Sequence, residues 1–321
     1  MAVYTDISDD ELDGLLADFD LGEAVSFKGI AEGVSNSNFL LETDKGRFIL
    51  TIFEKRTNPN DLPFFLGLMD WLSTHDYPSA GPVRDRQGRM LKTLRGKPAV
   101  IVAFLPGISV RKPTVAHCRA AGEGLGWLHL ASEGFPMTRI NDLGHAAWAG
   151  MFGPLKAEAE ALKPGLAAVI EGDLAMLAAR WPQGLPQGVV HADYFPDNVF
   201  FHGQDFAGAI DFYFACTDAY AYDLAVTLNA WCFEADGSFN ITAARALIAG
   251  YEIRRPLSVA ERAALPVLAH GAAMRFFLTR LADWGATPAG ALVRPKDPLE
   301  YERKLAVHRA SPDLVLFGAG A

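Results

Sequence analysis

The chain has 321 residues, a formal net charge of −9 and a pI near 5.4, and half of its residues are hydrophobic. This length exceeds the needs of one small core and predicts two lobes of a folded globular protein. The acidic balance argues against nucleic acid or an anionic membrane surface as the main partner, because both attract clustered Lys and Arg. A nucleotide ligand is still allowed, since one phosphate site needs only a few local donors and a metal ion.

The cysteines and the first residues bear on the compartment. Cys118, Cys216 and Cys232 are far apart and form no CxxC pair, so we expect neither a disulfide framework nor a zinc site. Residues 1–20 are acidic and lack the basic-then-apolar pattern of a signal peptide. No run of 18 apolar residues occurs, so no membrane span is predicted. These features predict a reducing cytoplasm, and they leave the oligomeric state open.

The first third of the chain is predicted to be rich in β-structure. An amphipathic helix over residues 6–19 comes first, with Ser8 placed to cap it and Glu11 three residues later. A second helix is predicted over 61–74, with Pro63 in its first turn. Strands are predicted at 25–31, 38–43, 47–53 and 99–105, with a hairpin turn at 44–46, and short strands are predicted on either side of a turn at 85–88.

After Pro106-Gly107 the pattern becomes mostly helical. Helices are predicted at 114–132, 220–233, 242–251, 258–283 and 297–309, and two more within 155–179 on either side of Pro164-Gly165. Short strands are predicted at 189–191, 199–201 and 206–212. The sequence therefore predicts an α+β protein with a β-rich N-terminal lobe over 1–105 and a mostly helical C-terminal lobe over 106–321.

The strongest chemical signal is residues 190–214, VHADYFPDNVFFHGQDFAGAIDFYF. Here His191-x-Asp193 is followed by Asn198, and a strand then ends at Asp211. Phosphoryl transfer needs positioning and charge neutralisation more than covalent chemistry. Asp193 could orient the attacking hydroxyl and accept its proton, while Asn198 and Asp211 offer Mg²⁺ the hard oxygen ligands it prefers. His191 would hold the loop; the alternative is a capped turn with polar surface residues.

This segment resembles the Brenner motif of the aminoglycoside phosphotransferase and choline kinase group, part of the protein-kinase-like clan. That group has His-x-Asp where protein kinases have His-Arg-Asp, and Ala192 fits it. The resemblance implies a bilobal fold with ATP in the cleft between the lobes. It also implies Asp193 as the catalytic base and Asn198 and Asp211 as the metal ligands.

In the first lobe, the segment 29–39 (GIAEGVSNSNF) lies where the clan has its phosphate-covering loop. Residues there that could contact phosphate oxygens are Gly33, Ser35, Asn36 and Asn38. An ordinary hairpin would have a similar composition. Val102 and Phe104 lie where the clan's hinge binds adenine, although a buried edge strand is equally compatible.

One position departs from the clan. The third strand usually carries a Lys that pairs with the ATP phosphates, and here Thr51 stands at that place. Lys28, Lys55 or Arg56 could substitute, and the sequence does not choose between them.

Several longer segments resemble the bacterial homoserine kinases of the kinase-like type. They include GIAEGVSNSNFLLET, FILTIFEKR, HADYFPDNVFF, IDFYFACTDAYAYDLAVTLNAWCF and KDPLEYERKL. The resemblance runs over nearly the whole chain. It implies transfer of the γ-phosphate of ATP to the hydroxyl of L-homoserine, a step that feeds threonine synthesis.

The residues permit such a substrate. Arg275 and Arg280, on an apolar helix, are candidates for its carboxylate, and Tyr194 and Tyr213 for walls of its pocket. A carboxylate or aromatic faces would bind its ammonium, and candidates near the motif in sequence are Asp218, Asp223, Tyr220 and Trp231. Asp223 is more readily interpreted as structural, and His129 as a core residue.

Rival functions remain open at this point. A choline, ethanolamine or other amino-alcohol kinase would need an aromatic cage and no carboxylate-binding Arg. An aminoglycoside kinase would need a strongly acidic cleft, which the charge allows and the Arg-bearing helix disfavours. A nucleotide-binding pseudokinase is favoured by Thr51 alone, because Asp193, Asn198 and Asp211 are all present.

Overall fold

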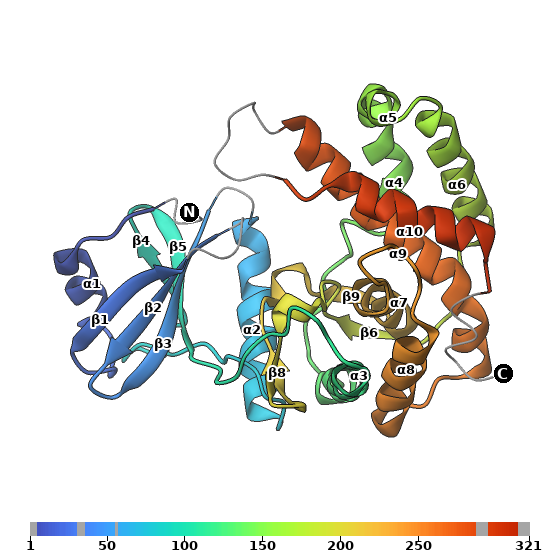
Figure 1. Ribbon diagram of the computed structural model, residues 1–321. Helices are drawn as coiled ribbons and strands as arrows, with labels where there is room; N and C mark the ends of the chain where they lie inside the picture. The colour runs from blue at the N-terminus through green and yellow to red at the C-terminus, as the bar shows by residue number, and fades with distance from the viewer. Residues whose placement is uncertain (1–4, 31–35, 55–56, 287–294, 314–321) are drawn as a thin grey trace. The chain divides into compact units, whose positions relative to one another are not determined.

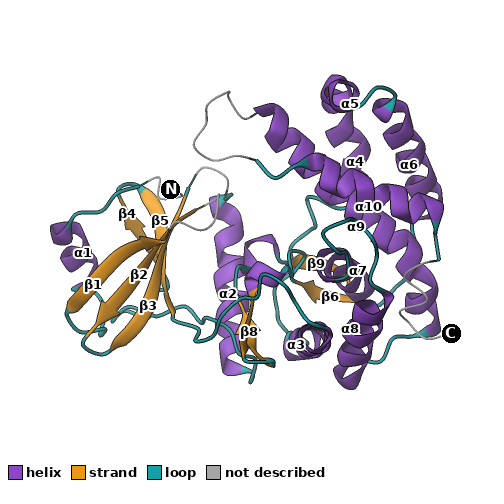
Figure 2. Cartoon of the chain, viewed as in Figure 1, coloured by secondary structure: helices purple, strands orange, loops and turns teal. Residues whose placement is uncertain are grey.

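The computed structural model describes residues 5–30, 36–54, 57–286 and 295–313. The chain divides into two compact units, Met1–Pro106 and Gly107–Ala321 (Figure 1). The first is built around a sheet and the second mostly from helices, as the colouring by secondary structure shows (Figure 2).

The first unit contains a five-stranded antiparallel sheet in the order β1-β2-β3-β5-β4. Its strands are β1 (Ala24–Ile30), β2 (Asn36–Thr43), β3 (Gly46–Phe53), β4 (Leu91–Leu94) and β5 (Lys97–Ala103). Alternate side chains of β2 are buried, and apolar residues of the sheet form one core with Leu12, Leu16 and Phe19. The hairpin predicted between β2 and β3 is confirmed, with Thr43 paired to Gly46.

Two helices accompany this sheet. In α1 (Asp9–Leu16), Ser8 and Glu11 form the predicted capping box, with the Ser8 side chain accepting from the Glu11 N–H. The α2 helix (Leu62–Thr74) begins with Pro63 in its first turn, where a missing N–H costs no hydrogen bond.

The second unit consists mostly of helices. They are α3 (Val115–Ala131), α4 (His145–Phe152), α5 (Lys156–Leu162), α6 (Leu166–Arg180), α7 (Tyr220–Trp231), α8 (Ile241–Arg254), α9 (Val259–Ala286) and α10 (Pro298–Ala310). Within the described ranges, no helix combines the length and apolar character that crossing a bilayer requires. All three cysteines are buried as free thiols.

Helices α3 and α8 approach each other unusually closely. A Cβ added to Gly122 would lie 1.9 Å from the carbonyl oxygen of Leu247, and one added to Gly250 would lie 1.9 Å from that of Arg119. Glycine at both positions therefore lets the two backbones come into contact.

Two short ribbons complete the second unit. Strand β6 (Gln187–Val190) pairs with β9 (Cys216–Ala219), and β7 (Val199–His202) pairs with β8 (Asp205–Ala209). The sequence did not predict β9 or α4, which are four and eight residues long.

The strand predicted over 206–212 was too long. It ends at Ala209, because Asp211 takes a left-handed conformation (φ 63°) that a strand cannot contain, and a 3₁₀ turn, Phe212–Phe214, follows. Asp tolerates this conformation better than most residues. The turn points the chain away from the ribbon directly after the predicted metal ligand.

Candidate active site

The His-x-Asp segment forms the loop between β6 and β7, in the second unit. Val190 ends β6 as a buried residue, and Ala192 has a positive φ of 60°. The loop closes through two short backbone bonds, from the Phe195 N–H to the Asp193 carbonyl (2.8 Å) and from the Asn198 N–H to the Phe195 carbonyl (2.9 Å). A left-handed non-glycine residue costs free energy, so the surrounding contacts must hold this loop in place.

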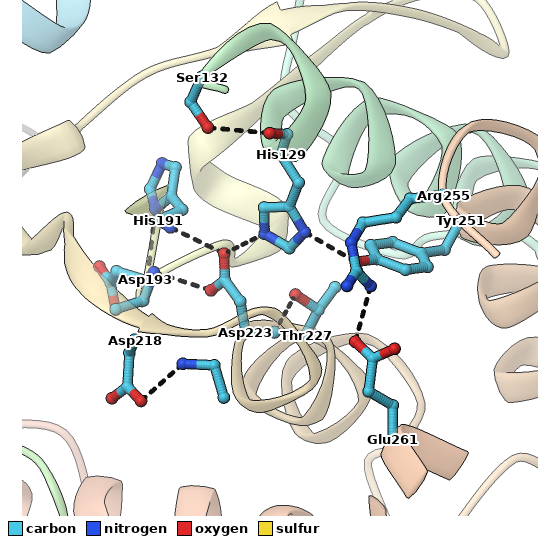
Figure 3. A network of polar contacts seen from close by, with 12 residues as sticks. His129, Ser132, His191, Asp193, Asp218, Asp223, Thr227, Tyr251, Arg255 and Glu261 are labelled. Carbon is cyan, nitrogen blue, oxygen red and sulfur yellow. Dashed lines mark hydrogen bonds and ion pairs between the residues drawn. The ribbon is translucent and has the colours of Figure 1, made fainter. Parts of the chain in front are cut away.

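Asp223, at the start of α7, supplies those contacts (Figure 3). Its Oδ2 accepts a hydrogen bond from the His191 N–H (2.7 Å) and its Oδ1 from the Ala192 N–H (2.8 Å). The carboxylate is fully buried, so both bonds form away from water. The structural role expected for Asp223 agrees with this geometry.

The Asp223 carboxylate is held in turn by a chain of buried side chains. His129 donates from Nε2 to Asp223 Oδ2 (3.1 Å), and its Nδ1 accepts from the Tyr251 hydroxyl (2.8 Å). Arg255 donates to the Tyr251 oxygen (3.1 Å) and is paired with Glu261 (2.7 Å). Burial lowers the pKa of His129, and a neutral imidazole fits this sequence of donors and acceptors.

His191 joins the loop to the segment that carries Asp211. Its Nε2 donates to the Ile210 carbonyl (2.9 Å), and its Nδ1 accepts from the Asp193 N–H (3.3 Å). Burial lowers the pKa of His191 as well, so a neutral ring is again favoured. The Ile210 N–H also donates to the Asn198 carbonyl (3.0 Å), so both predicted metal ligands come from segments that are bonded to each other.

Asn198 and Asp211 fit a divalent cation. The Asn198 amide nitrogen donates to the Asp193 carbonyl (2.9 Å) and to Asp193 Oδ2 (3.3 Å), which leaves the amide oxygen for a metal. Loss of hydration beside the packed protein raises the pKa of Asp211 to about 7, and the negative charges of Asp193 and Asp197 add to the rise. A cation would relieve this repulsion, and Asp211 remains accessible to solvent.

No group of three or more His, Cys, Asp and Glu side chains able to hold a metal is found in the part of the chain that the structure describes. Asn198 and Asp211 would thus act as a pair, with nucleotide phosphates and water completing the coordination of a Mg²⁺ ion.

Asp193 lies partly exposed at the centre of the loop. Loss of hydration raises the pKa of Asp193, while the charges of Arg275, His191 and Lys296 oppose the rise. Arg275 extends from α9 and donates to the carbonyl of Ala192, the residue before Asp193. Its guanidinium also lies over the ring of Phe276, at 4.3 Å from the centroid. Of the two arginines predicted to read the substrate, the structure therefore brings Arg275 to the loop.

Arg280 has other partners. It donates to Glu300 Oε2 (2.6 Å) and to the Asp297 carbonyl (3.2 Å), and lies 4.5 Å over the ring of Tyr301. These contacts join α9 to the start of α10.

The remaining candidates of this unit are placed as follows. Tyr194 is fully buried with its ring 5.4 Å from that of His191, and Tyr213 is half-buried in the turn after Asp211. Asp218 accepts from the Asn141 amide (2.7 Å). The indole N–H of Trp231, on α7, donates to the Tyr194 carbonyl (2.8 Å), so Trp231 also helps to hold the loop.

In the first unit, two of the four predicted phosphate contacts, Gly33 and Ser35, lie outside the described residues. The Asn36 side-chain oxygen accepts from the Glu54 N–H (3.3 Å) and from the Thr57 hydroxyl (3.3 Å). The Asn38 oxygen accepts from the Thr51 hydroxyl (2.8 Å). Both side chains are therefore engaged with β3 or the segment after it.

The two positions predicted to bind adenine lie in β5, at Val102, and just after it, at Phe104. Val102 is buried and paired with Ile49 of β3, and the Phe104 N–H donates to the Arg47 carbonyl (3.2 Å). The Ala103 N–H also has a partner within the unit, the Gly81 carbonyl (2.9 Å). Adenine would have to use other backbone groups here.

Of the possible substitutes for the absent strand-three Lys, only Lys28 is among the described residues. Thr51 is buried and bonded to Asn38. Lys28 belongs to β1, where it pairs opposite Leu40. Lys55 and Arg56 lie outside the described residues.

Sequence reasoning missed one charged pair beside the loop. Lys296, just before α10, places its ammonium 3.9 Å from Asp197 Oδ2 and 5.6 Å from the centre of the Phe195 ring. The late segment KDPLEYERKL had been noted only for its resemblance, and its distance in sequence from the motif gave no sign of this proximity.

The sequence is similar to known phosphotransferases over most of its length. Residues 26–257 match the model of the phosphotransferase enzyme family. A homoserine kinase of Phenylobacterium zucineum (strain HLK1) is 76% identical over 321 residues, which is 100% of this chain and 99% of the relative. A homoserine kinase of Caulobacter sp. (strain K31) is 73% identical over 322 residues and 100% of both chains.

The fold is similar to that of solved small-molecule kinases. The amicoumacin kinase hAmiN, solved in complex with AMP-PNP and Ca²⁺, superposes with a TM-score of 0.68 at 18% identity, over 96% of this chain and 93% of that one. At this identity the likeness bears on the fold alone. It confirms the predicted α+β, protein-kinase-like fold, with a β-rich first part and a mostly helical remainder.

Proposed function

This chain belongs to the phosphotransferase enzyme family and, within it, to the homoserine kinases, and we propose that Asp193 is the base that activates the hydroxyl of L-homoserine for attack on ATP. The reaction yields ADP and O-phospho-L-homoserine, a step of threonine biosynthesis. A cytoplasmic location stays a prediction.

The observation that carries this proposal is how Asp193 is held. Its main chain is fixed through His191 and Asn198, and the residue before it through Asp223 and Arg275. Asp193 nevertheless stays partly exposed. A base that is rigid yet reachable can orient a hydroxyl in line with the γ-phosphorus and accept its proton, so direct transfer needs no phosphoenzyme.

Mg²⁺ is the cation that we assign to Asn198 and Asp211. When bound, it supplies charge neutralisation to the phosphates. The protein's own part is to present a carboxylate and an amide oxygen from two segments joined by the Ile210–Asn198 bond. The rise in the pKa of Asp211 toward 7 adds a reason for a cation to bind there.

The substrate carboxylate is assigned to Arg275. Its Nε is buried and, among the described residues, has no hydrogen-bond partner, and the same holds for the hydroxyl of Tyr301. Tyr301 stacks on Phe276, the neighbour of Arg275, with ring centroids 5.2 Å apart. Buried donors without partners are rare in folded proteins, and a carboxylate beside Asp193 would satisfy them. Arg280, which is paired with Glu300, is less suited to this role.

The test is an ADP-release assay with Mg-ATP and five acceptors: L-homoserine, L-serine, L-threonine, choline and kanamycin. Strong preference for L-homoserine is expected. Preference for choline or kanamycin would retain the phosphotransferase chemistry and refute the assigned acceptor. ATP binding without turnover of any acceptor would instead identify a pseudokinase.

A further inference from the structure

Three carboxylates influence one another at the catalytic loop, the segment between β6 and β7: Asp193 and Asp197 lie within it, and Asp211 follows β8. Asp193, Asp197 and Asp211 are close enough for Asp193 and Asp197 to raise the pKa of Asp211 further, beyond the rise caused by the surrounding protein. A nucleotide triphosphate adds more negative charge. Asn198 is neutral and Asp211 is a carboxylate, so the two proposed metal ligands add no positive charge of their own. The strand-three position, which usually holds a Lys, holds Thr51.

Among the described residues, Arg275 and Lys296 both oppose the rise in the pKa of Asp193, and Lys296 also opposes that of Asp211. Arg275 is 3% exposed, bonded to the Ala192 carbonyl and stacked on Phe276, so it is fixed in place. The Lys296 side chain is 66% exposed, and its ammonium is 3.9 Å from Asp197 Oδ2, beyond the range of a strong hydrogen bond. Arg275 can thus bind an anion only at a fixed position, whereas the charge of Lys296 can move with a phosphoryl group.

The backbone that follows Lys296 is held by hydrogen bonds, while the Lys296 side chain is mostly exposed. Asp297 caps α10 through its side chain, which accepts from the Leu299 N–H (2.9 Å). Arg280 binds the Asp297 carbonyl from α9 (3.2 Å). The Lys296 ammonium lies 5.6 Å from the centre of the Phe195 ring, which belongs to the loop itself. A long side chain on a fixed backbone lets its charge follow the phosphoryl group as that group moves from the leaving oxygen to the acceptor oxygen.

We propose that Lys296 is a further catalytic residue, whose ammonium binds a non-bridging oxygen of the phosphoryl group during transfer and takes over the charge role of the absent strand-three Lys. The inference rests on the proposed phosphotransferase function. In the step, the bond from the γ-phosphorus to the β–γ bridging oxygen breaks and a bond to the acceptor oxygen forms. The hydroxyl proton passes to Asp193 and ADP leaves, while Lys296 stays protonated throughout.

The test compares K296M with D197N, K296R and K156M. K296M removes the charge and keeps the length of the side chain. D197N breaks the Lys296–Asp197 pair but keeps the ammonium. K156M is a matched control, because Lys156 is also exposed (53%) and ion-paired, with Glu171 on α6. Steady-state kinetics with Mg-ATP and L-homoserine give kcat and each KM, and calorimetry gives the affinity of each variant for AMP-PNP and ADP.

K296M is expected to lower kcat about 10²-fold, the loss typical of removing one preorganised charge stabiliser, with little change in the KM for L-homoserine. It should weaken AMP-PNP binding more than ADP binding, since only AMP-PNP has a γ-phosphate group. K296R should retain most of the turnover and K156M nearly all of it, and D197N should lose far less than K296M.

Three results would overturn the proposal. An equal loss in D197N and K296M would show that the pair only anchors the loop. A raised KM for L-homoserine at unchanged kcat would place Lys296 on the acceptor, and unchanged kinetics would remove it from the reaction. The AMP-PNP and ADP titrations need no acceptor, so they test Lys296 even if L-homoserine proves to be the wrong substrate.

Discussion

The two sides of the catalytic loop are built in opposite ways. On the inner side, the N–H groups of His191 and Ala192 end on Asp223, which is fully buried (Figure 3). On the outer side, Asp197 and Lys296 are about two-thirds exposed and 3.9 Å apart. Buried hydrogen bonds hold geometry, whereas exposed charges contribute little to stability and can rearrange. The contrast suggests that the inner side sets the position of Asp193 and the outer side meets the moving phosphate.

The largest effect is expected where the two sides meet, at Asp193. D193N keeps the shape of the side chain and removes its ability to accept a proton. Turnover should fall roughly 10²–10⁴-fold, the range typical of losing a general base. ADP release measures the loss, and circular dichroism and the melting temperature should match wild type. Wild-type turnover in D193N would show that another group is the base.

Breaking the inner side should cost stability as well as activity. D223A would leave the N–H groups of His191 and Ala192 buried without an acceptor and would remove the partner of His129. Urea denaturation should show a loss of about 3–5 kcal/mol. D218A is the matched control: Asp218 is partly exposed and bonded to Asn141, so about 1 kcal/mol is expected. Equal losses in both variants would contradict the special role of Asp223.

A smaller effect should separate substrate binding from loop support at Arg275. Hydrogen bonds to charged groups contribute about 1.5–3 kcal/mol, so R275M should lower kcat/KM for L-homoserine by about 10–150-fold. The loss should be much smaller for 3-aminopropan-1-ol, which has the same amine and hydroxyl but no carboxylate. R280M, which breaks the pair with Glu300, should not discriminate between the two acceptors. Equal losses with both acceptors in R275M would show that Arg275 only supports the loop, through its bond to the Ala192 carbonyl.

The smallest expected effect is a pH dependence of the inner side. Burial lowers the pKa of His129 and of His191, whereas an unfolded histidine titrates near 6.5. Below about pH 6.5 the unfolded chain therefore binds more protons, and the free energy of unfolding falls as pH falls. Each histidine contributes at most about 1.4 kcal/mol per pH unit. The raised pKa values of Asp211 and Asp193 act in the opposite direction over the same range, so the contribution of His129 is the difference between wild type and H129Q in urea denaturation from pH 8 to 5. Stability should fall less steeply with falling pH in H129Q than in wild type, and an identical pH dependence in both would exclude His129.

The sequence predicted the elements of this fold well because hydrophobic period and turn residues are local. The capping box at Ser8, the hairpin before Gly46 and the strand-loop-strand around Asp193 all depend on neighbours in the chain. The end of β8 was wrong because the left-handed conformation of Asp211 is imposed by its surroundings. Strand β9 was not predicted because its four residues show no clear alternation of apolar and polar side chains, and it is defined by its pairing with β6.

The residues of the candidate site also differ in whether neighbours in the sequence or tertiary packing reveal them. Asp193, Asn198 and Asp211 share a spacing that phosphoryl transfer requires, and a reader of the sequence can recognise it. Lys296 could not be found, since about 100 residues and several packed helices lie between it and Asp197 in the chain, and only tertiary packing brings them together. Arg275 could be predicted as a candidate because a charge is conspicuous on an apolar helix.

The close contact of α3 and α8 has a genetic consequence. A single added methyl group at Gly122 or Gly250 would meet a carbonyl oxygen at 1.9 Å, so neither helix can accept alanine without moving. Cells that depend on this gene for threonine should therefore lose growth through alanine alleles at these glycines as readily as through alleles of the catalytic loop. Such alleles would map to positions that take no part in the chemistry, and a second-site change that separates the helices should restore growth.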